Sequence, residues 1–173
     1  CVLATRRSRL ALTQTRWVAR AVNAARPAWV TAELGVVTTG DRERSWSLEE
    51  RGGKGLFTKE VEDAVLGGRA DLAVHSLKDL ATSMAEGLAL GAVPVREDPC
   101  DVLVLRRGAG APGRIATGSP RRRAQLALAY PEAGFTELRG NVETRLRKVA
   151  GGEADATVLA AAGLNRLGVS SFE

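Results

Sequence analysis

The sequence predicts an α/β protein made of two lobes of similar plan. Its 173 residues, 45% hydrophobic and 26% charged, have the ordinary balance of a globular protein. Short apolar runs alternate with segments whose apolar residues recur at helical spacing. A double glycine followed by Ala-Asp occurs at residues 67–71 and again at 151–155, each time between an amphipathic helix and an apolar strand. This repetition indicates that one supersecondary pattern is used twice.

The first lobe is expected to begin with a short buried strand at residues 2–4 and a loop at 5–9. The loop has free N–H groups and Arg side chains, which favour an anion. Apolar residues at helical spacing then continue from Leu10 up to Pro27. A second strand is predicted at residues 30–39, before Gly40 and Asp41.

The middle of the first lobe is predicted to carry a site at the end of a strand. The glycines of residues 52–57 imply a tight or mobile backbone, and the P-loop pattern GxxxxGK[ST] is absent. Thr58 can cap the next helix, and the double glycine ends it. The apolar run from residue 70 reads as a buried parallel strand, beyond which ligands bind in open α/β sheets. Lys78 and Asp79 are therefore expected at the mouth of a sheet, the alternative being a surface loop with an incidental ion pair.

The second lobe is predicted to follow an extended crossing at residues 94–99, which has proline at both ends. Ser119 is a plausible N-cap with Pro120 at the first helical position. The three arginines at 121–123 then oppose the helix dipole, which costs stability unless an anion sits there. A solvated surface turn is the alternative. Asn141 is expected to cap a further helix that carries Arg145.

Composition excludes several classes of function. The net charge is +5, and 21 of the 25 basic residues are Arg, whose planar fork matches carboxylate or phosphate. Aromatic residues make up 4% and are not interleaved with the arginines, so nucleic-acid binding is only a minor alternative. Cys1, Cys100 and the sole histidine, His75, form no metal-ligand or disulfide pattern, so no metal is expected. No apolar run approaches the ~20 residues that span a bilayer and no signal peptide is evident, so we expect no membrane contact and a cytoplasmic protein.

The basic residues near the predicted strand ends could line a cleft between the lobes and bind a ligand with many carboxylates. Asp79 is then a lone acid among bases. Such a carboxylate is poised to stay ionised and to stabilise a cation formed during a reaction. The basic set comprises Arg6, Lys78, Arg121, Arg122, Arg139 and Arg145.

Eight motifs resemble those of the porphobilinogen deaminase (hydroxymethylbilane synthase) family, in the same order over essentially the whole chain. They lie at residues 4–8, 39–41, 52–57, 74–79, 96–99, 121–122, 138–142 and 162–168. The resemblance implies two lobes of periplasmic-binding-protein type with mixed sheets flanked by helices. Lobe 1 is expected at 1–96 and lobe 2 at 97–173. The small third domain, with the cysteine that carries the cofactor, is expected to be absent from this chain.

The resemblance also implies an activity, a cofactor and a set of site residues. The family joins four porphobilinogen units head to tail, with loss of ammonia, on a covalent dipyrromethane cofactor. Asp79 matches the main catalytic acid. The matches for cofactor binding are Ser76, Lys78, Thr117, Ser119, Arg121, Arg122 and Arg145. The matches for binding the acidic pyrrole substrate are Arg6, Ser8, Asp41, Lys54, Arg139 and Arg166.

Four positions depart from the family pattern and could alter the cofactor fit, namely Arg9, Ala81, Gly118 and Pro120. Neither cysteine lies in the motif of the cofactor-carrying one, so the 173-residue chain made alone is expected to carry no covalent cofactor and to be inactive. The complete enzyme is expected to be a monomer. A non-catalytic paralogue or fragment that binds a polycarboxylate in the same cleft is the alternative.

Overall fold

The computed structural model describes residues 1–39 and 57–169. The chain divides into two compact units, Cys1–Val95 and Arg96–Glu173, and each has its own sheet. In the described residues no helix has the length and apolar character that crossing a membrane requires. Asp41, Lys54 and the glycines of the 52–57 motif lie outside the described residues.

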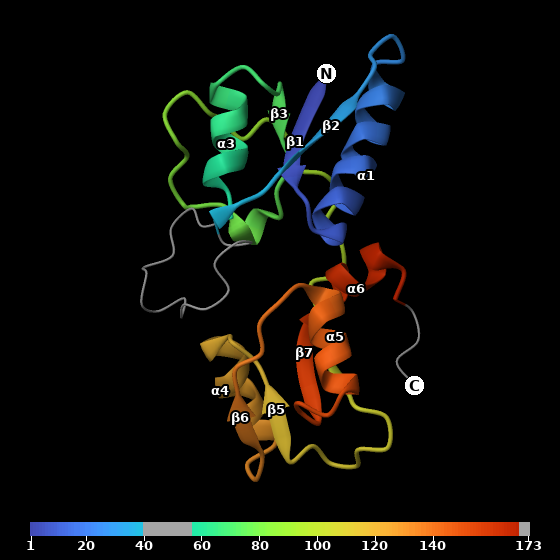
Figure 1. The fold of residues 1–173 in the computed structure, drawn as a ribbon, viewed down its shortest axis with the longest axis vertical. Helices are drawn as coiled ribbons and strands as arrows, with labels where there is room; N and C mark the ends of the chain where they lie inside the picture. Colours follow the sequence, from blue (N-terminus) through green and yellow to red (C-terminus); the bar gives the residue numbers. More distant parts are fainter. Residues whose placement is uncertain (40–56, 170–173) are drawn as a thin grey trace. The chain divides into compact units, whose positions relative to one another are not determined.

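Unit 1 is built on a parallel sheet of order β2-β1-β3. Its strands are β1 (Val2–Arg6), β2 (Ala32–Val36) and β3 (Leu72–Ala73). Helix α1 (Arg9–Ala25) joins β1 to β2, α3 (Lys59–Leu66) joins β2 to β3, and the 3₁₀ helix η1 (Leu77–Asp79) follows β3 (Figure 1). The central strand β1 is the most buried of the three, and its Ala4 packs with Val61 and Ala64 of α3.

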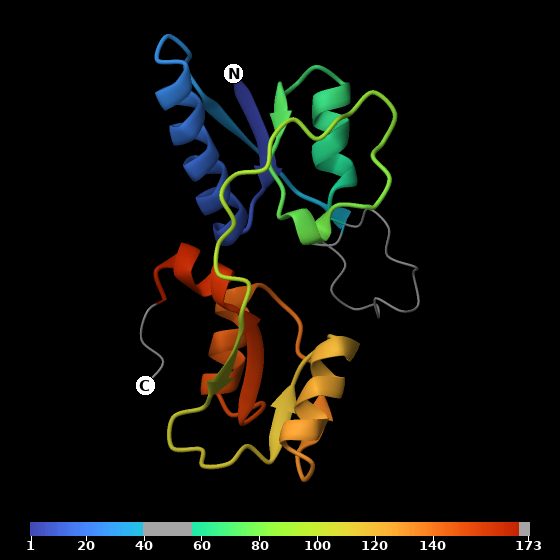
Figure 2. The same cartoon turned by 180° about the vertical axis from the view of Figure 1, so that it is seen from behind.

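Unit 2 is built on a mixed sheet of order β4-β7-β5-β6. Its strands are β4 (Asp101–Leu105), β5 (Arg114–Ala116), β6 (Gly134–Thr136) and β7 (Ala156–Ala160), and its helices are α4 (Pro120–Ala129), α5 (Val142–Ala150) and α6 (Ala161–Leu167). Strand β4 runs antiparallel beside β7, while the other pairs are parallel (Figure 2). Two clusters of buried side chains form its core, one around Ala116 and Val149 and the other around Val104 and Leu159.

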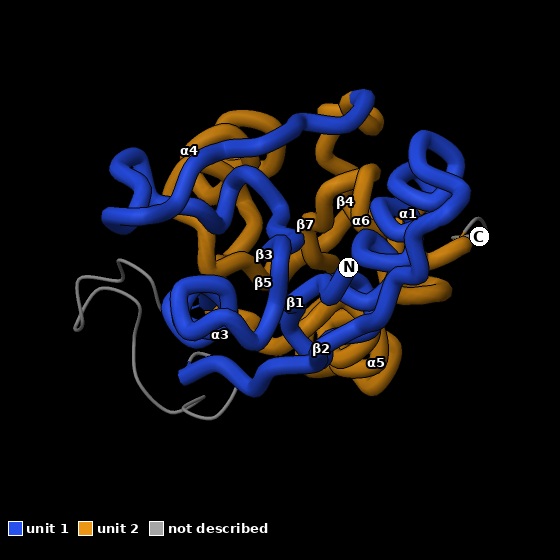
Figure 3. The backbone as a smooth tube through the Cα atoms, turned by 90° about the horizontal axis from the view of Figure 1, so that it is seen from above, with its two compact units in different colours: residues 1–95 blue, residues 96–173 orange. Residues whose placement is uncertain are grey.

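The repeated sequence pattern corresponds to a repeated structure. The order β5-α4-β6-α5-β7 follows the same plan as β1-α1-β2-α3-β3, with the first strand of each set in the middle. In unit 1 the two helices lie on opposite sides of β1 and β2 (Figure 3). In unit 1 Asp71 Oδ2 accepts from Val2 N at 2.7 Å, and in unit 2 Asp155 Oδ2 accepts from Arg114 N at 2.9 Å. The aspartate of each Gly-Gly-x-Ala-Asp pattern therefore fastens the start of a central strand.

Two predicted strands are shorter than expected. The run from residue 70 was expected as a buried strand, but β3 has two residues at a sheet edge and Leu72 is 40% exposed. The reason is that β3 has only β1 as a neighbour. Strand β2 covers 32–36 and not 30–39, because it pairs in register with the five residues of β1 and ends where that partner ends.

The predicted helix starts are mostly confirmed. The side chains of Ser119 and Asn141 accept hydrogen bonds from the first turns of α4 and α5. Thr58 precedes α3 as expected, but its backbone is helical and its side chain makes no capping bond, so that prediction was wrong in mechanism. Ser8, which sequence reasoning placed only in a loop, caps α1 by accepting from Ala11 N at 3.3 Å.

Candidate functional site

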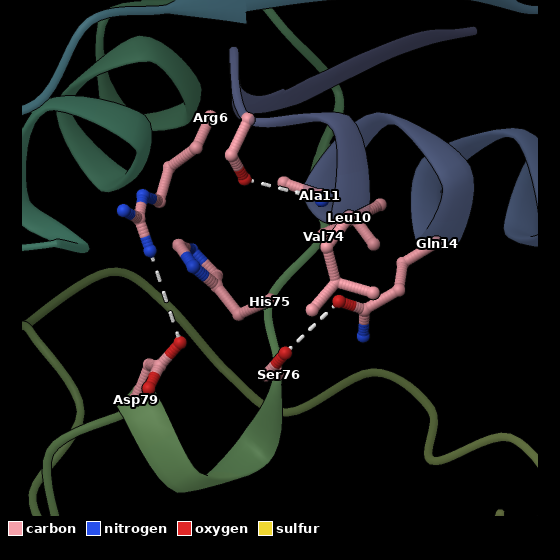
Figure 4. Close-up of a pocket in the computed structure, with 9 residues that line it drawn as sticks. Arg6, Leu10, Ala11, Gln14, Val74, His75, Ser76 and Asp79 are labelled. Atoms are coloured by element: carbon pink, nitrogen blue, oxygen red, sulfur yellow. Dashed lines mark hydrogen bonds and ion pairs between the residues drawn. The ribbon is translucent and has the colours of Figure 1, made fainter. Parts of the chain in front are cut away.

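A small pocket in unit 1 lies where β1 ends and where the chain leaves β3. Figure 4 shows the residues that line it, which come from the end of β1, the first turns of α1 and the segment from Val74 to η1. It therefore forms beyond the carboxyl ends of two adjacent parallel strands, the usual position of ligand sites in open α/β sheets. Its polar lining residues are Arg6, Ser8, Gln14, His75, Ser76 and Asp79.

The charged pair of this pocket joins Arg6 and Asp79. The Nη1 atom of Arg6 lies 4.0 Å from Oδ2 of Asp79, and the guanidinium lies over the ring of Phe57 with its Cζ 4.3 Å from the centroid. At 4.0 Å the pair is an ion pair without a direct hydrogen bond. The Asp79 side chain is 30% exposed, so its carboxylate remains open to a ligand. The structure thus brings the predicted catalytic acid beside a predicted substrate-binding cation.

The neutral residues of the pocket hold its walls together. Ser76 donates its hydroxyl to Oε1 of Gln14 at 2.9 Å, which ties the segment before η1 to helix α1. Ser8 lines the same pocket while it caps α1. Lys78 is exposed on η1 and does not line the pocket.

In unit 2 the predicted residues gather at the start of α4. Thr117 is buried, and its hydroxyl accepts from the backbone N–H of Ser119 at 3.2 Å. The Ser119 hydroxyl accepts in turn from Arg122 N. Arg121 is exposed at the first turn of the helix. This local network sets the direction of α4, as the Ser-Pro pattern predicted.

The arginines of α4 have partners within the chain. Arg122 donates Nε to Asp101 Oδ2 at 2.8 Å, pairs Nη2 with the other oxygen of that carboxylate, and donates Nη1 to the Val158 carbonyl at 3.3 Å. Arg123 lies over the ring of Phe135. The anion expected beside these arginines is thus supplied in part by Asp101. Arg121 remains an exposed cation in the first turn of α4, where a bound anion would offset its unfavourable interaction with the helix dipole.

Arg145 on α5 is a half-buried cation beside another cation. Its Nε donates to the Gly140 carbonyl at 2.8 Å. Burial, together with the charge of Arg122, lowers the pKa of the Arg145 guanidinium from its usual value. A desolvated cation near a like charge is stabilised by a bound anion, so Arg145 is suited to a ligand carboxylate.

The remaining predicted residues lie elsewhere in unit 2. Arg139 pairs with Glu137 at 3.3 Å. Arg166 lies in the last turn of α6, where a cation is favourable to the helix dipole. In the described residues no group of three or more acidic, histidine or cysteine side chains could hold a metal ion.

Sequence reasoning assigned no site role to His75, Gln14, Phe57 or Asp101. His75 and Phe57 lie inside the motifs at residues 74–79 and 52–57, so their place in these motifs could have indicated a role in the site. The contacts of Gln14 with Ser76 and of Asp101 with Arg122 join residues far apart in the chain. Only the fold brings those partners together.

Comparison with known proteins identifies the family of this arrangement. A family model described as porphobilinogen deaminase, dipyromethane cofactor binding domain, matches residues 1–172. The chain belongs to the porphobilinogen deaminase family. A porphobilinogen deaminase of Sorangium cellulosum is 52% identical over 98% of this chain and 58% of the relative, and one of Syntrophobacter fumaroxidans is 49% identical over 96% and 55%. The chain therefore spans a little over half the length of the curated porphobilinogen deaminases it matches.

The backbone of Gly140 supports the Arg145 site, which gives a test of the local geometry. Gly140 has a φ of +121°, and a Cβ added there would lie 2.6 Å from Thr144 Cγ2 and 2.8 Å from Thr144 Cβ. We expect Gly140→Ala to lower the free energy of unfolding by about 1–3 kcal/mol, because it forces a strained conformation as well as a clash. Chemical denaturation measures this.

Gly110→Ala is the control, since Gly110 has neither a positive φ nor any atom within 4 Å of an added Cβ. Equal stability of the two variants would contradict the local geometry given for Gly140.

Proposed function

We propose that this chain supplies the cofactor-binding and substrate-binding part of a porphobilinogen deaminase. The complete enzyme would join four porphobilinogen molecules head to tail, release ammonia and form hydroxymethylbilane. The observation that carries the proposal is the Arg6–Asp79 pair in the unit 1 pocket, because a partly exposed carboxylate beside a cation could stabilise a cationic intermediate bound there. Membership of the family supports it.

The proposed role of Asp79 is electrostatic. Loss of ammonia from the aminomethyl group of porphobilinogen leaves an azafulvenium-like cation, and a carboxylate fixed beside that cation stabilises it with little reorganisation. Arg6 would bind a carboxylate of the substrate while it orients Asp79. Ser8 and Ser76 offer hydroxyl groups in the same pocket.

The residues of unit 2 fit an acidic cofactor such as dipyrromethane, whose acetate and propionate groups need cationic partners. Arg145 is desolvated and lies near Arg122, so one carboxylate could relieve the repulsion between the two guanidinium groups. Arg121, Thr117 and Ser119 would supply further donors. Dipyrromethane would provide the pyrrole end on which the chain grows. Lys54, Lys78, Asp41, Arg139 and Arg166 remain proposed binding residues on the strength of the motif match.

We further propose that the complete enzyme is a cytoplasmic monomer that acts on a small pyrrole and not on nucleic acid. The pairing of Arg16 with Glu33 and of Arg106 with Asp155 supports this, since arginines paired within the chain are less available to phosphates. Size-exclusion chromatography with light scattering would test the monomer. A larger assembly would contradict it.

The experiment that tests the function is an assay of the complete native protein with porphobilinogen. We expect ammonia release together with hydroxymethylbilane, in a ratio of about four to one from the proposed head-to-tail joining of four units. Intact mass spectrometry should show a covalent dipyrromethane adduct. Binding of porphobilinogen without any ammonia release would instead support a non-catalytic polycarboxylate-binding protein.

A further inference from the structure

His75 lines the same pocket as Arg6 and Asp79, yet the proposed function assigns it no role. Its ring extends toward the Arg6–Asp79 pair and away from the hydrogen bond between Ser76 and Gln14 (Figure 4). The Nε2 atom is buried and has no hydrogen-bond partner among the described residues. Buried polar atoms are seldom left unpaired, so this one calls for a functional explanation.

Charged groups on three elements act electrostatically on the His75 ring: Arg6 on β1, Asp79 on η1 and Glu62 on α3. Burial is the largest influence and lowers the pKa of the imidazole from its usual 6.5. Arg6 lowers it further, while Glu62 and Asp79 oppose the shift. The net direction is downward, so the ring is uncharged at neutral pH.

The charge of this ring matters because the Arg6–Asp79 pair is loosely held. At 4.0 Å the two groups share no direct hydrogen bond. An imidazolium would repel the Arg6 guanidinium and offer Asp79 a competing cation at the same edge of the pocket. An uncharged ring does neither.

We propose that His75 is a positioning residue, which as an uncharged imidazole keeps Arg6 beside Asp79 and on protonation uncouples the two. The activity experiment below rests on the proposed function, because it uses porphobilinogen as the substrate. The titration experiment needs no substrate and so tests the inference even if the proposed function is wrong.

The titration experiment follows the histidine ring signals of the folded protein by NMR across the range from pH 4 to 9. The His75 signal is assigned by its loss in His75→Gln. We expect its pKa below 6.5, lower still in Asp79→Asn and higher in Arg6→Gln, because these variants remove the groups that raise and lower it. A pKa at or above 6.5 in the wild type, or no response to either variant, would overturn the proposal.

The activity experiment compares the pH profiles of kcat/KM for porphobilinogen. In the wild type kcat/KM should fall as the pH drops through the pKa of His75. In His75→Gln we expect kcat/KM to be about tenfold lower at pH 8, mostly through kcat. Because glutamine has no proton to gain, the fall of kcat/KM at low pH (the acid limb of the profile) should move down by about one pH unit or more. An acid limb at the wild-type pH in this variant would overturn the proposal.

Glu86→Gln is the matched control, because it removes an exposed titratable group of unit 1 outside the pocket. Its profile should superimpose on that of the wild type, and a shifted acid limb in this variant too would overturn the assignment of the limb to His75. A wild type that makes no product at any pH would refute the proposed function, while the titration experiment would still decide the role of His75.

Discussion

Asp79→Asn is expected to lower the turnover of the complete enzyme by about a hundredfold or more, because asparagine keeps the shape of the side chain but removes the charge that stabilises a developing cation. The effect should fall on kcat more than on KM, since a cation that exists only along the reaction path gains the most from the carboxylate. Steady-state kinetics with porphobilinogen at saturating concentration measures it.

The control for this variant is Asp71→Asn in the same unit. Asp71 accepts a backbone hydrogen bond from Val2 at the opposite end of β1. We expect that substitution to reduce stability while the turnover of the folded enzyme stays near that of the wild type. Near-normal turnover in Asp79→Asn would remove Asp79 from the mechanism.

Arg145→Gln is expected to weaken capture of the acidic cofactor by about tenfold or more. The half-buried guanidinium would be lost as a charge-assisted donor, and a ligand carboxylate would be left in a poorly solvated place without a cation. The measurement is the yield of covalent adduct, by intact mass, when the apoenzyme is supplied with porphobilinogen at limiting concentrations.

Arg147→Gln on the same helix is the matched control. Arg147 is exposed in the last turn of α5, where its charge favours the helix terminus. Its variant should load cofactor as the wild type does. Equal loss in the two variants would show a general effect of charge on α5 in place of a specific site at Arg145.

Local chemistry explains why much of the fold could be predicted from the sequence. Ser119 followed by Pro120 is a local signal for the start of α4, and the double glycines at 67–68 and 151–152 directly follow α3 and α5. The lengths of strands are different, because they depend on the neighbours that a strand finds. The extents of β2 and β3 follow from their pairing with β1, which no local pattern reveals.

The candidate site divides in the same way. Asp79 and Arg6 could be predicted to belong to one site because both follow apolar runs that parallel strands would bring to one edge of a sheet. The hydrogen bonds between Asp101 and Arg122 could not be predicted in this way. They join the antiparallel strand β4 to the first turn of α4, about twenty residues further along the chain. For the same reason no local pattern reveals that Arg106 pairs with Asp155 at 3.0 Å.

The aspartates that follow the double glycines stabilise the ends of β1 and β5 that lie away from the site residues. Asp71 and Asp155 act as clasps at the beginnings of β1 and β5, and each also donates its own backbone N–H to the residue it holds. The carboxyl ends of the same strands lead to Arg6 in one unit and to the Thr117 turn in the other. Substitutions at the carboxyl rim, where the site residues of unit 1 lie, would therefore leave the hydrogen bonds of these two aspartates at the opposite rim in place.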